Sequence, residues 1–327
     1  MTFQKPYRYI VLLMIALLGW NHNILSNTSM KHPSFFAYKK VFKYQVFDDT
    51  PLNYLAYTHF IGCYIKNIPS NQLFHSSSQN NYFVGSIFET INLSKRNLTK
   101  FSFNQTQFIN SSLNSLLIQN GTFKLVTFSS SKLQAIVFQD SYFKKISFPN
   151  SYLKDLIFIN CTFDNETEEA LKRHDAIIGF KGLEEKAKNK AILTNHSFFS
   201  ISFEKLNLNF LTFNASKFDF CIFKNLSLRQ ISITHSKLYK SSFINIKGFN
   251  SVFSNSDLLD TKIKDSNLEK TTFKNVTIVN SEFKNVNFSQ SNWENVTIKN
   301  SKFINCQFDD LKTKNVQITN SPTFVIN

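Results

Sequence analysis

The chain has 327 residues, 42% of them hydrophobic, and its 37 Lys and Arg against 22 Asp and Glu give a formal net charge of +15. This length is sufficient for one large domain. The charge excludes a strongly acidic protein and favours anionic partners such as phospholipid head groups, lipopolysaccharide, acidic protein surfaces or nucleic acid.

The first 26 residues have the pattern of an export signal. Lys5 and Arg8 precede an apolar run from Ile10 to Leu18. Such a run is typical of a secretory signal, whereas a membrane span needs about 20 apolar residues. We therefore predict that residues 1–26 form a signal peptide or an N-terminal anchor. The protein is then extracytoplasmic, in the periplasm or associated with the outer membrane. An ordinary buried helix is the alternative.

Residues 27–80 are rich in aromatic side chains but do not show the repeat that follows them. The open end of a solenoid exposes backbone groups and apolar side chains, so a segment before the first coil is expected to cover it. We predict an N-terminal cap over residues 27–80. Docking to a partner is the alternative role for this segment.

From residue 81 to residue 163 a five-residue repeat dominates the sequence. Every fifth position from Phe83 to Phe163 is Phe, Leu or Ile, a period that fits neither a helix nor a flat strand. It does fit a chain that turns a corner every five residues and closes a four-sided coil, because like residues then recur every twenty positions. The predicted interior includes Phe103, Phe123, Phe143, Phe163, Phe223, Phe243, Phe283 and Phe303.

The positions around each large residue follow the same period. Two residues earlier the side chain is small or β-branched, as at Val126 and Ser141, so that large and small side chains together fill a narrow coil. Two residues later a corner is expected, and a corner with positive φ prefers Gly and then Asn. Asn recurs at corner positions 225, 245, 250, 255, 275, 280, 285, 295, 300, 305, 315 and 320.

These units resemble those of the pentapeptide-repeat proteins. The segments 281–285 (Ser-Glu-Phe-Lys-Asn) and 301–305 (Ser-Lys-Phe-Ile-Asn) match the family's unit of a small, a polar and a large apolar residue followed by two further positions. The resemblance implies an all-β solenoid, a right-handed quadrilateral β-helix. This chain departs from the common pattern by using Phe more than Leu and by placing Asn at the corner.

Residues 164–197 interrupt the repeat and predict a helical insertion. Asn165 followed by Glu168 has the pattern of a capping box, Gly179 that of a helix stop, and residues 183–190 that of a second helical stretch. The insertion either adds specificity to a filled solenoid or is a tolerated loop. Its candidate partner contacts are Glu168, Glu169, Arg173, Glu184, Glu185, Lys186 and Lys188.

The repeat resumes as a second block over residues 198–320, followed by a C-terminal tail at 321–327. In this block 23 of the 25 positions from Phe198 to Ile318 are Phe, Leu, Ile or Trp. The exceptions are Gly248 and Thr313. A bulge at Gly248 would turn Phe249 inward instead.

The sequence contains no constellation of catalytic residues. A nucleophile elbow, a phosphate-binding Gly-rich loop and a zinc-protease motif are all missing from the 327 residues. The His residues form no ligand spacing with Cys or carboxylates, and Cys161, Cys221 and Cys306 take small inward positions. We predict no enzyme activity, metal, cofactor or small-molecule substrate.

These observations lead us to expect a non-catalytic structural or interaction scaffold in the bacterial cell envelope. Its expected partners are other envelope proteins, with an anionic lipid or lipopolysaccharide surface as a further candidate, and its specific role would be that of a subunit of a secretion-system outer-membrane assembly. An exported effector that binds proteins in a host cell is the alternative. The resemblance also raises a gyrase-binding DNA mimic, but the net charge of +15 and the export signal disfavour that function and a nucleic-acid partner.

Overall fold

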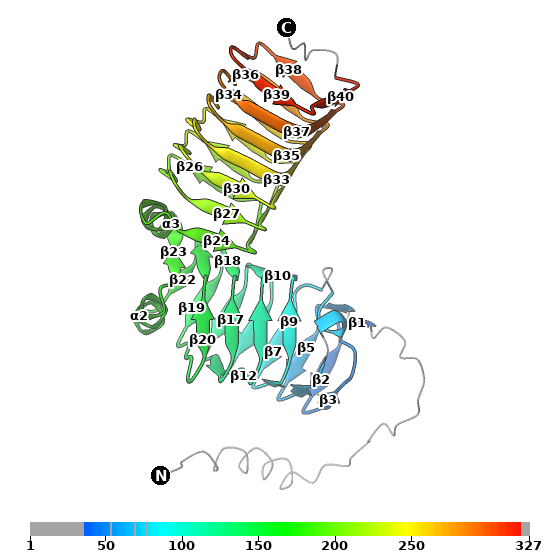
Figure 1. Cartoon of the computed structure of the whole chain (residues 1–327). Helices are drawn as coiled ribbons and strands as arrows, with labels where there is room; N and C mark the ends of the chain where they lie inside the picture. Colours follow the sequence, from blue (N-terminus) through cyan, green and yellow to red (C-terminus); the bar gives the residue numbers. More distant parts are fainter. Residues whose placement is uncertain (1–35, 53, 69, 76–77, 322–327) are drawn as a thin grey trace. The chain divides into compact units, whose positions relative to one another are not determined.

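The computed structural model describes residues 36–321, apart from residues 53, 69 and 76–77, and it shows a parallel β-solenoid with two short α-helices (Figure 1). From residue 82 onward the paired positions are twenty residues apart, as where Phe103 lies between Phe83 and Phe123. The predicted four-sided coil and its helical insertion are thereby confirmed. The predicted signal, residues 1–26, lies outside the described residues.

The first block comprises the strands from residue 36 to residue 163. Its first face contains β2 (Val41–Lys43), β5 (His59–Ile61), β7 (Tyr82–Val84), β11 (Ser102–Asn104), β15 (Thr122–Lys124), β19 (Tyr142–Lys144) and β22 (Thr162–Phe163). The second contains β3 (Val46–Asp48), β6 (Tyr64–Lys66), β8 (Ile87–Glu89), β12 (Gln107–Ile109) and β16 (Thr127–Ser129). The third contains β9 (Asn92–Ser94), β13 (Ser112–Asn114), β17 (Lys132–Gln134) and β20 (Tyr152–Lys154).

The fourth face of this block is called the junction face below, because it contacts the second block. It contains β10 (Asn97–Thr99), β14 (Leu117–Gln119), β18 (Val137–Gln139), β21 (Ile157–Ile159) and β23 (Ile177–Ile178). The pair β1 (Phe36–Tyr38) and β4 (Tyr54–Ala56) is linked to the same face by single bridges through Gln79. A 3-10 turn, η1, covers Ser70–Gln72.

The second block comprises residues 191–321. One large sheet contains two faces, with β24 (Ile192–Thr194), β25 (Ser197–Phe199), β27 (Thr212–Asn214), β28 (Lys217–Asp219), β30 (Ser232–Thr234), β31 (Lys237–Tyr239), β33 (Val252–Leu259), β35 (Thr272–Val279), β37 (Asn292–Lys299), β39 (Lys312–Lys314) and β40 (Gln317–Thr319). The next face contains β26 (Ser202–Glu204), β29 (Ile222–Lys224), β32 (Ser242–Ile244), β34 (Lys262–Asn267), β36 (Glu282–Asn287) and β38 (Lys302–Ile304).

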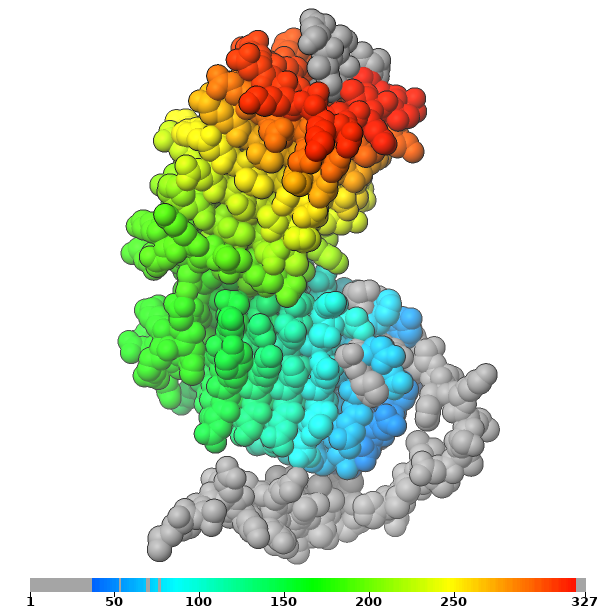
Figure 2. Space-filling model, viewed as in Figure 1, coloured from blue at the N-terminus to red at the C-terminus, as the bar shows by residue number. Residues whose placement is uncertain are grey.

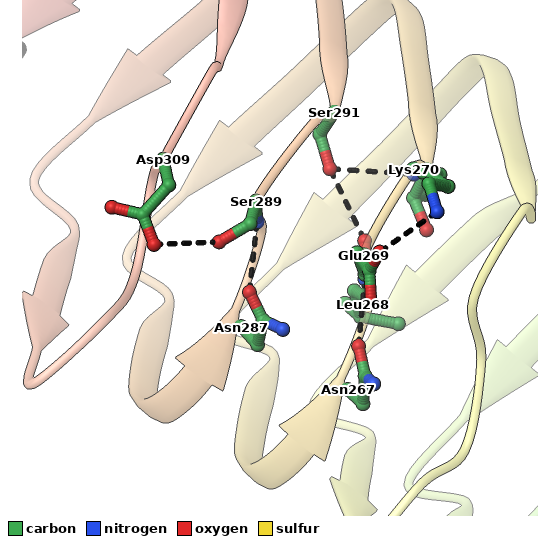
Figure 3. Close-up of polar contacts among 9 residues, drawn as sticks. Asn267, Leu268, Glu269, Lys270, Asn287, Ser289, Ser291 and Asp309 are labelled. Carbon is green, nitrogen blue, oxygen red and sulfur yellow. Dashed lines mark hydrogen bonds and ion pairs between the residues drawn. The ribbon is translucent and has the colours of Figure 1, made fainter.

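The fourth side of the second block is formed mainly by turns. Single bridges join 207 to 227, 227 to 247, 247 to 267 and 287 to 307, and Asn267 pairs with Asn287 at the ends of β34 and β36. The side-chain oxygen of Asn267 accepts a hydrogen bond from the amide of Glu269, and Asn287 does the same for Ser289 (Figure 3). Asn side chains that cap the backbone two residues on favour turns over strands. The sequence of this side thus explains its irregular backbone.

The corners have the conformation that the sequence predicts. The twelve corner Asn residues named above have φ between 49° and 57°. Many also form ladders along the outside of the second block, because the amide nitrogen of one Asn donates to the oxygen of the Asn one coil earlier. Asn275 donates to Asn255 and Asn295 to Asn275, both at 2.9 Å. Asn therefore combines tolerance of the left-handed region with a bond between coils.

Two kinds of column fill the interior. Aromatic rings stack along the coils, with ring centroids 4.8 Å apart for Phe203 and Phe223 and 4.5 Å apart for Phe223 and Phe243. Buried hydroxyls form the second kind of column: the Oγ of Ser236 accepts from the amide of Ser216 at 3.0 Å. The small inward position therefore contributes hydrogen bonds as well as volume. Its hydroxyls accept hydrogen bonds from buried backbone amides, which would lack a partner if the core were purely apolar.

The solenoid begins earlier than predicted, so the proposed cap over residues 27–80 needs correction. Strands β1 to β6 lie within that segment, and their inward residues recur in two five-residue runs: Ala37, Phe42, Phe47 and Leu52, then Leu55, Phe60 and Ile65. The two runs are out of phase. Val41 consequently pairs with His59 and His59 with Tyr82, separations of 18 and 23 residues instead of twenty. A fixed five-residue frame could not detect coils that shift phase.

Gly248 also differs from the expectation of a bulge. The frame is unbroken there, Gly248 is buried and Phe249 is turned outward. A Cβ added to Gly248 would lie 2.9 Å from the side chain of Leu268, which leans into the space that a larger residue would occupy. The neighbouring coil therefore compensates for the missing side chain.

Candidate interaction surface

Side chains fill the interior of the solenoid over the residues that the structure describes. The predicted core residues are buried, except that Phe163 at the end of the first block is half-buried: Phe103, Phe123, Phe143, Phe223, Phe243, Phe283 and Phe303. Two internal voids measure about 10 Å³ each. A void of that size holds at most one water molecule, whereas ligand pockets measure hundreds of Å³. These two voids are therefore too small for a ligand, and outward side chains are the candidates for a binding site in the described part of the chain.

The buried cysteine and serine side chains of the interior are not placed to act as nucleophiles. Burial raises the pKa of the Cys161 and Cys221 thiols to about 12, so neither is a thiolate at neutral pH. Ser141 and Lys144 have the Ser-x-x-Lys spacing of a nucleophile and its base. Ser141 is buried and Lys144 is exposed, so the hydroxyl and the amine lie on opposite sides of the coil wall. Among the residues that the structure describes, no three His, Cys, Asp or Glu side chains gather as a metal site would need, and no helix is long and apolar enough to cross a membrane.

The first helix of the insertion, α2 (Asn165–Arg173), covers the last coil of the first block. Its N-cap is Asp164, whose carboxylate accepts from the amide of Thr167 at 3.1 Å. Asn165, which the sequence suggested as the cap, is instead the first helical residue. Leu171 is buried and belongs to the apolar core of the first block. The insertion therefore closes an otherwise exposed end of the solenoid.

The second helix, α3 (Gly179–Lys188), begins where the sequence predicted a stop. Gly179 has φ +66°, and it starts this helix rather than ending α2, whose C-cap is His174. Leu183 and Ala187 are buried in the apolar core of the second block. The carboxylate of Glu184 accepts from the amide of Asn207 at 2.8 Å. This helix is accordingly part of the start of the second block.

The seven candidate contacts in the insertion do not form a single site. Glu168 pairs with Lys172 at 2.7 Å, Lys186 pairs with Asp175, and Glu184 is used by Asn207. The others are exposed on the helix surface: Glu169, Arg173, Glu185 and Lys188. Their arrangement is that of charges on the outer sides of two capping helices.

The contact between the blocks was missed by the sequence analysis. On the junction face the outward residues Leu117, Val137, Ile157 and Ile159 are buried, and they share an apolar core with Phe198 of the second block. An outward face of the first block thus packs against the first coil of the second. The sequence did contain a signal, because these outward positions are apolar where other outward positions are polar.

His196 completes this contact. Its side chain is buried, and its Nε2 atom lies 2.9 Å from the backbone oxygen of Asp155 in the first block. A carbonyl partner requires Nε2 to donate, which leaves Nδ1 unprotonated in the neutral ring. Burial lowers the pKa of His196 below its ordinary value of 6.5. Nδ1 itself is buried and has no hydrogen-bond partner within the described part of the chain.

A cleft of about 280 Å³ opens beside this contact. Its lining consists of polar and apolar residues from both blocks, including the outward ring of Phe199. The lining residues are Lys95, Asn97, Ser115, Leu117, Asn195, Ser197, Phe198, Phe199, Ala215, Lys217 and Asp219. Burial raises the pKa of the half-buried Asp219 carboxyl, and Lys217 and Lys237 oppose that shift. The lining residues of this cleft include two lysines, several amide and hydroxyl side chains and one carboxylate, that of Asp219.

An aromatic corner lies next to the cleft, and we define it as Phe199, Phe220 and Tyr239 with Lys217, Lys237 and Lys240. The rings contact one another in sequence along the coils, with centroids 5.5 Å apart for Phe199 and Phe220 and 5.7 Å apart for Phe220 and Tyr239. The ammonium of Lys240 lies 5.6 Å from the centroid of Phe220 and 5.1 Å from that of Tyr239. Aromatic and basic groups are thus interleaved.

Some lysines of the second block form ion pairs, and those of this corner form none with the described residues. Lys264 pairs with Glu282 at 3.0 Å and Lys274 with Glu294 at 3.2 Å, each across neighbouring coils. Among the described residues, no carboxylate lies within 4.0 Å of the ammonium groups of Lys217, Lys237 or Lys240. Successive coils place side chains in rows on the surface (Figure 2). The row that contains Lys217 and Lys237 therefore presents two neighbouring, unpaired cations.

Comparisons with known proteins found similar solved structures but no similar sequence family. No family model and no curated protein matches the sequence. Similar solved structures include HetL, a pentapeptide repeat protein involved in heterocyst differentiation regulation from the cyanobacterium Nostoc sp. strain PCC 7120, with 11% identity over 73% of this chain and 87% of HetL and a TM-score of 0.22. Another is Rfr23 from the cyanobacterium Cyanothece 51142, with 11% identity over 44% of this chain and 98% of Rfr23 and a TM-score of 0.21.

A third is full-length QnrB1, a plasmid-mediated fluoroquinolone resistance protein, with 13% identity over 68% of this chain and 93% of QnrB1 and a TM-score of 0.22. These overall similarities are low, so they support no transfer of function. The architecture rests instead on the chain's own geometry, namely a corner every five residues and pairing every twenty. By that geometry, the fold of this chain is the parallel β-solenoid of the pentapeptide-repeat proteins.

Proposed function

We propose that this protein is a non-catalytic scaffold of the bacterial cell envelope, which binds other envelope proteins through outward side chains. The observation that carries the proposal is the closed interior. Stacked rings and hydroxyl columns occupy the inside of the coils, with voids of about 10 Å³, so recognition is left to the outer surface. Stacked coils that hold side chains in fixed rows suit the docking of large partners.

The location in the envelope rests on the sequence of residues 1–26. A basic start followed by an apolar run favours export, and the net charge of +15 suits a compartment lined with anionic lipid and lipopolysaccharide. Within the envelope we propose a structural subunit of a larger assembly, such as a secretion-system outer-membrane complex. The unpaired lysines and exposed rings of the aromatic corner support a docked rather than a solitary protein.

Fractionation of the native cell tests this function. The fractions would be probed for the protein, its N-terminus would be sequenced by mass spectrometry, and complexes would be isolated after mild crosslinking. We expect the protein in the envelope fraction with stoichiometric partners. A cytoplasmic protein with an intact N-terminus would refute the envelope location, and a monomer in gently solubilised envelopes would refute the role as a subunit.

A further inference from the structure

We propose that the aromatic corner docks an acidic segment of a partner protein, one that also carries an apolar side chain. This inference rests on the proposed function as a protein-binding scaffold and names the surface and the chemistry of its partner. It is carried by three independent features of the corner: backbone strain, exposed aromatic area and unpaired positive charge.

The first feature is the conformation of Phe220. This residue occupies a corner with φ +58° and its side chain is 43% exposed. A bulky residue in the left-handed region is unfavourable, and Asn is the commonest residue at the corners of this block, as at Asn225 and Asn245. An Asn in place of Phe220 would also avoid the exposure of an aromatic ring to water. Strained residues that stability does not require are typical of functional positions.

The second feature is the shape of the aromatic cluster. The rings of Phe220 and Tyr239 meet edge to face at 79°, and Phe199 lies against Phe220 at 58° while it also lines the cleft. The rings therefore form a continuous apolar strip from the outer corner into a cleft of about 280 Å³. An apolar side chain of a partner could insert in the cleft while the flanking chain crosses the strip. Aromatic anchors beside a pocket are typical of binding hot spots.

The third feature is charge. Lys217, Lys237 and Lys240 surround the rings without a carboxylate within 4.0 Å among the described residues, and Lys95 lines the opposite wall of the cleft. The nearest acids in sequence register are Asp219, which is half-buried, and Asp257, which pairs in register with Lys237. Neither forms an ion pair with these lysines. Asp219 attracts Lys217 and Lys237 without forming an ion pair with either, so one half-buried carboxylate faces several lysines. A partner with carboxylates would supply further counter-charges, and such charges steer association and specificity.

Site-specific photocrosslinking in the native cell tests the proposal. A benzophenone amino acid would replace Tyr239, and the captured peptide would be sequenced by mass spectrometry. The matched control places the same group at Tyr142 on the first block, which is 41% exposed and shares its face with Lys124 and Lys144. We expect capture of a protein segment with net negative charge from position 239 and none from position 142.

Two variants make the test specific. Phe220→Asn, made in the chain with the crosslinker at position 239, should reduce capture at least tenfold while thermal unfolding stays cooperative, because Asn is the usual corner residue. Leu125→Asn changes another exposed corner residue, with φ +53°, and should leave capture unchanged. Lys217→Glu together with Lys237→Glu should abolish capture of an acidic segment.

The remaining outcomes would overturn the proposal. These are capture of a basic segment, a second copy of this chain, a lipid or a glycan from position 239, equal capture from both positions, or no capture. Failure of the proposed function is recognised separately, since fractionation reports the compartment whether or not position 239 is crosslinked. A cytoplasmic protein that is still crosslinked to an acidic segment would retain the docking site and refute the envelope role.

Discussion

The column of buried hydroxyls allows a quantitative prediction, for which Ser236 is well suited. Its side chain is 3% exposed, its Oγ accepts from the amide of Ser216 at 3.0 Å, and the same hydroxyl donates to the carbonyl of Thr234 at 2.8 Å. The amide of Ser216 has no other acceptor among the described residues. Ser236→Ala therefore removes one bond and leaves one buried N–H without a partner.

The expected cost follows from these two effects. A buried donor left unsatisfied costs about 1–3 kcal/mol, and the lost bond to Thr234 adds about 0.5–1.5 kcal/mol. Ala leaves almost no cavity in place of Ser, so packing contributes little. We expect Ser236→Ala to lower the free energy of unfolding by about 1.5–4.5 kcal/mol, a large effect for the loss of one small hydroxyl.

Urea unfolding followed by far-ultraviolet circular dichroism would measure this cost, and hydrogen exchange of the peptide that contains Ser216 would locate it. Ser254→Ala is the matched control. It removes a hydroxyl from an outward, half-buried position one coil further on and should change stability by less than about 0.5 kcal/mol. Equal effects of the two substitutions, or unchanged exchange at Ser216, would show that the hydroxyl column does not stabilise the coils.

Three further predictions concern the interior and the contact between the blocks. Phe223→Ala, within a stack of three rings, should lower the free energy of unfolding by about 3–5 kcal/mol in urea titrations, and Phe163→Ala at the half-buried end of the first block should cost clearly less. Because burial lowers the pKa of His196, the unfolded chain binds a proton first as pH falls. Stability should then be flat above the ordinary value of 6.5 and decrease below it, and His196→Gln should weaken that decrease; a pH-independent urea midpoint between pH 7.5 and 5 would contradict this sign. Ile157→Asp buries an unpaired charge between the blocks and should expose the nearby backbone to limited proteolysis, which intact wild-type protein would resist.

Most of the fold could be predicted because the five-residue period reports directly on local geometry. A large inward residue, a small inward residue and a corner each leave a mark on a short stretch of sequence. The corner Asn residues all take positive φ, and Phe103 pairs with residues twenty positions away on both sides. These features depend only on contacts between adjacent coils, which a regular frame encodes.

The features that could not be predicted depend on contacts outside that frame. The outward residues Leu117 and Ile157 are buried because another part of the chain covers them, and the period contains no information about which face is covered. The coils before residue 66 were hidden by a change of phase. In the sequence Phe199 and Phe220 are two apolar residues at outward positions, and nothing in the repeat indicates that their rings contact each other beside one cleft.

The contact at the junction face has a consequence for the order in which the chain folds. Within a block each coil needs only its predecessor, twenty residues earlier, so growth can proceed stepwise. The first coil of the second block instead needs Leu117, Val137 and Ile157, which belong to three successive coils of the first. The second block therefore acquires its starting template only after the first is assembled. This sequence of events matches the direction in which a newly made or exported chain becomes available from its N-terminus.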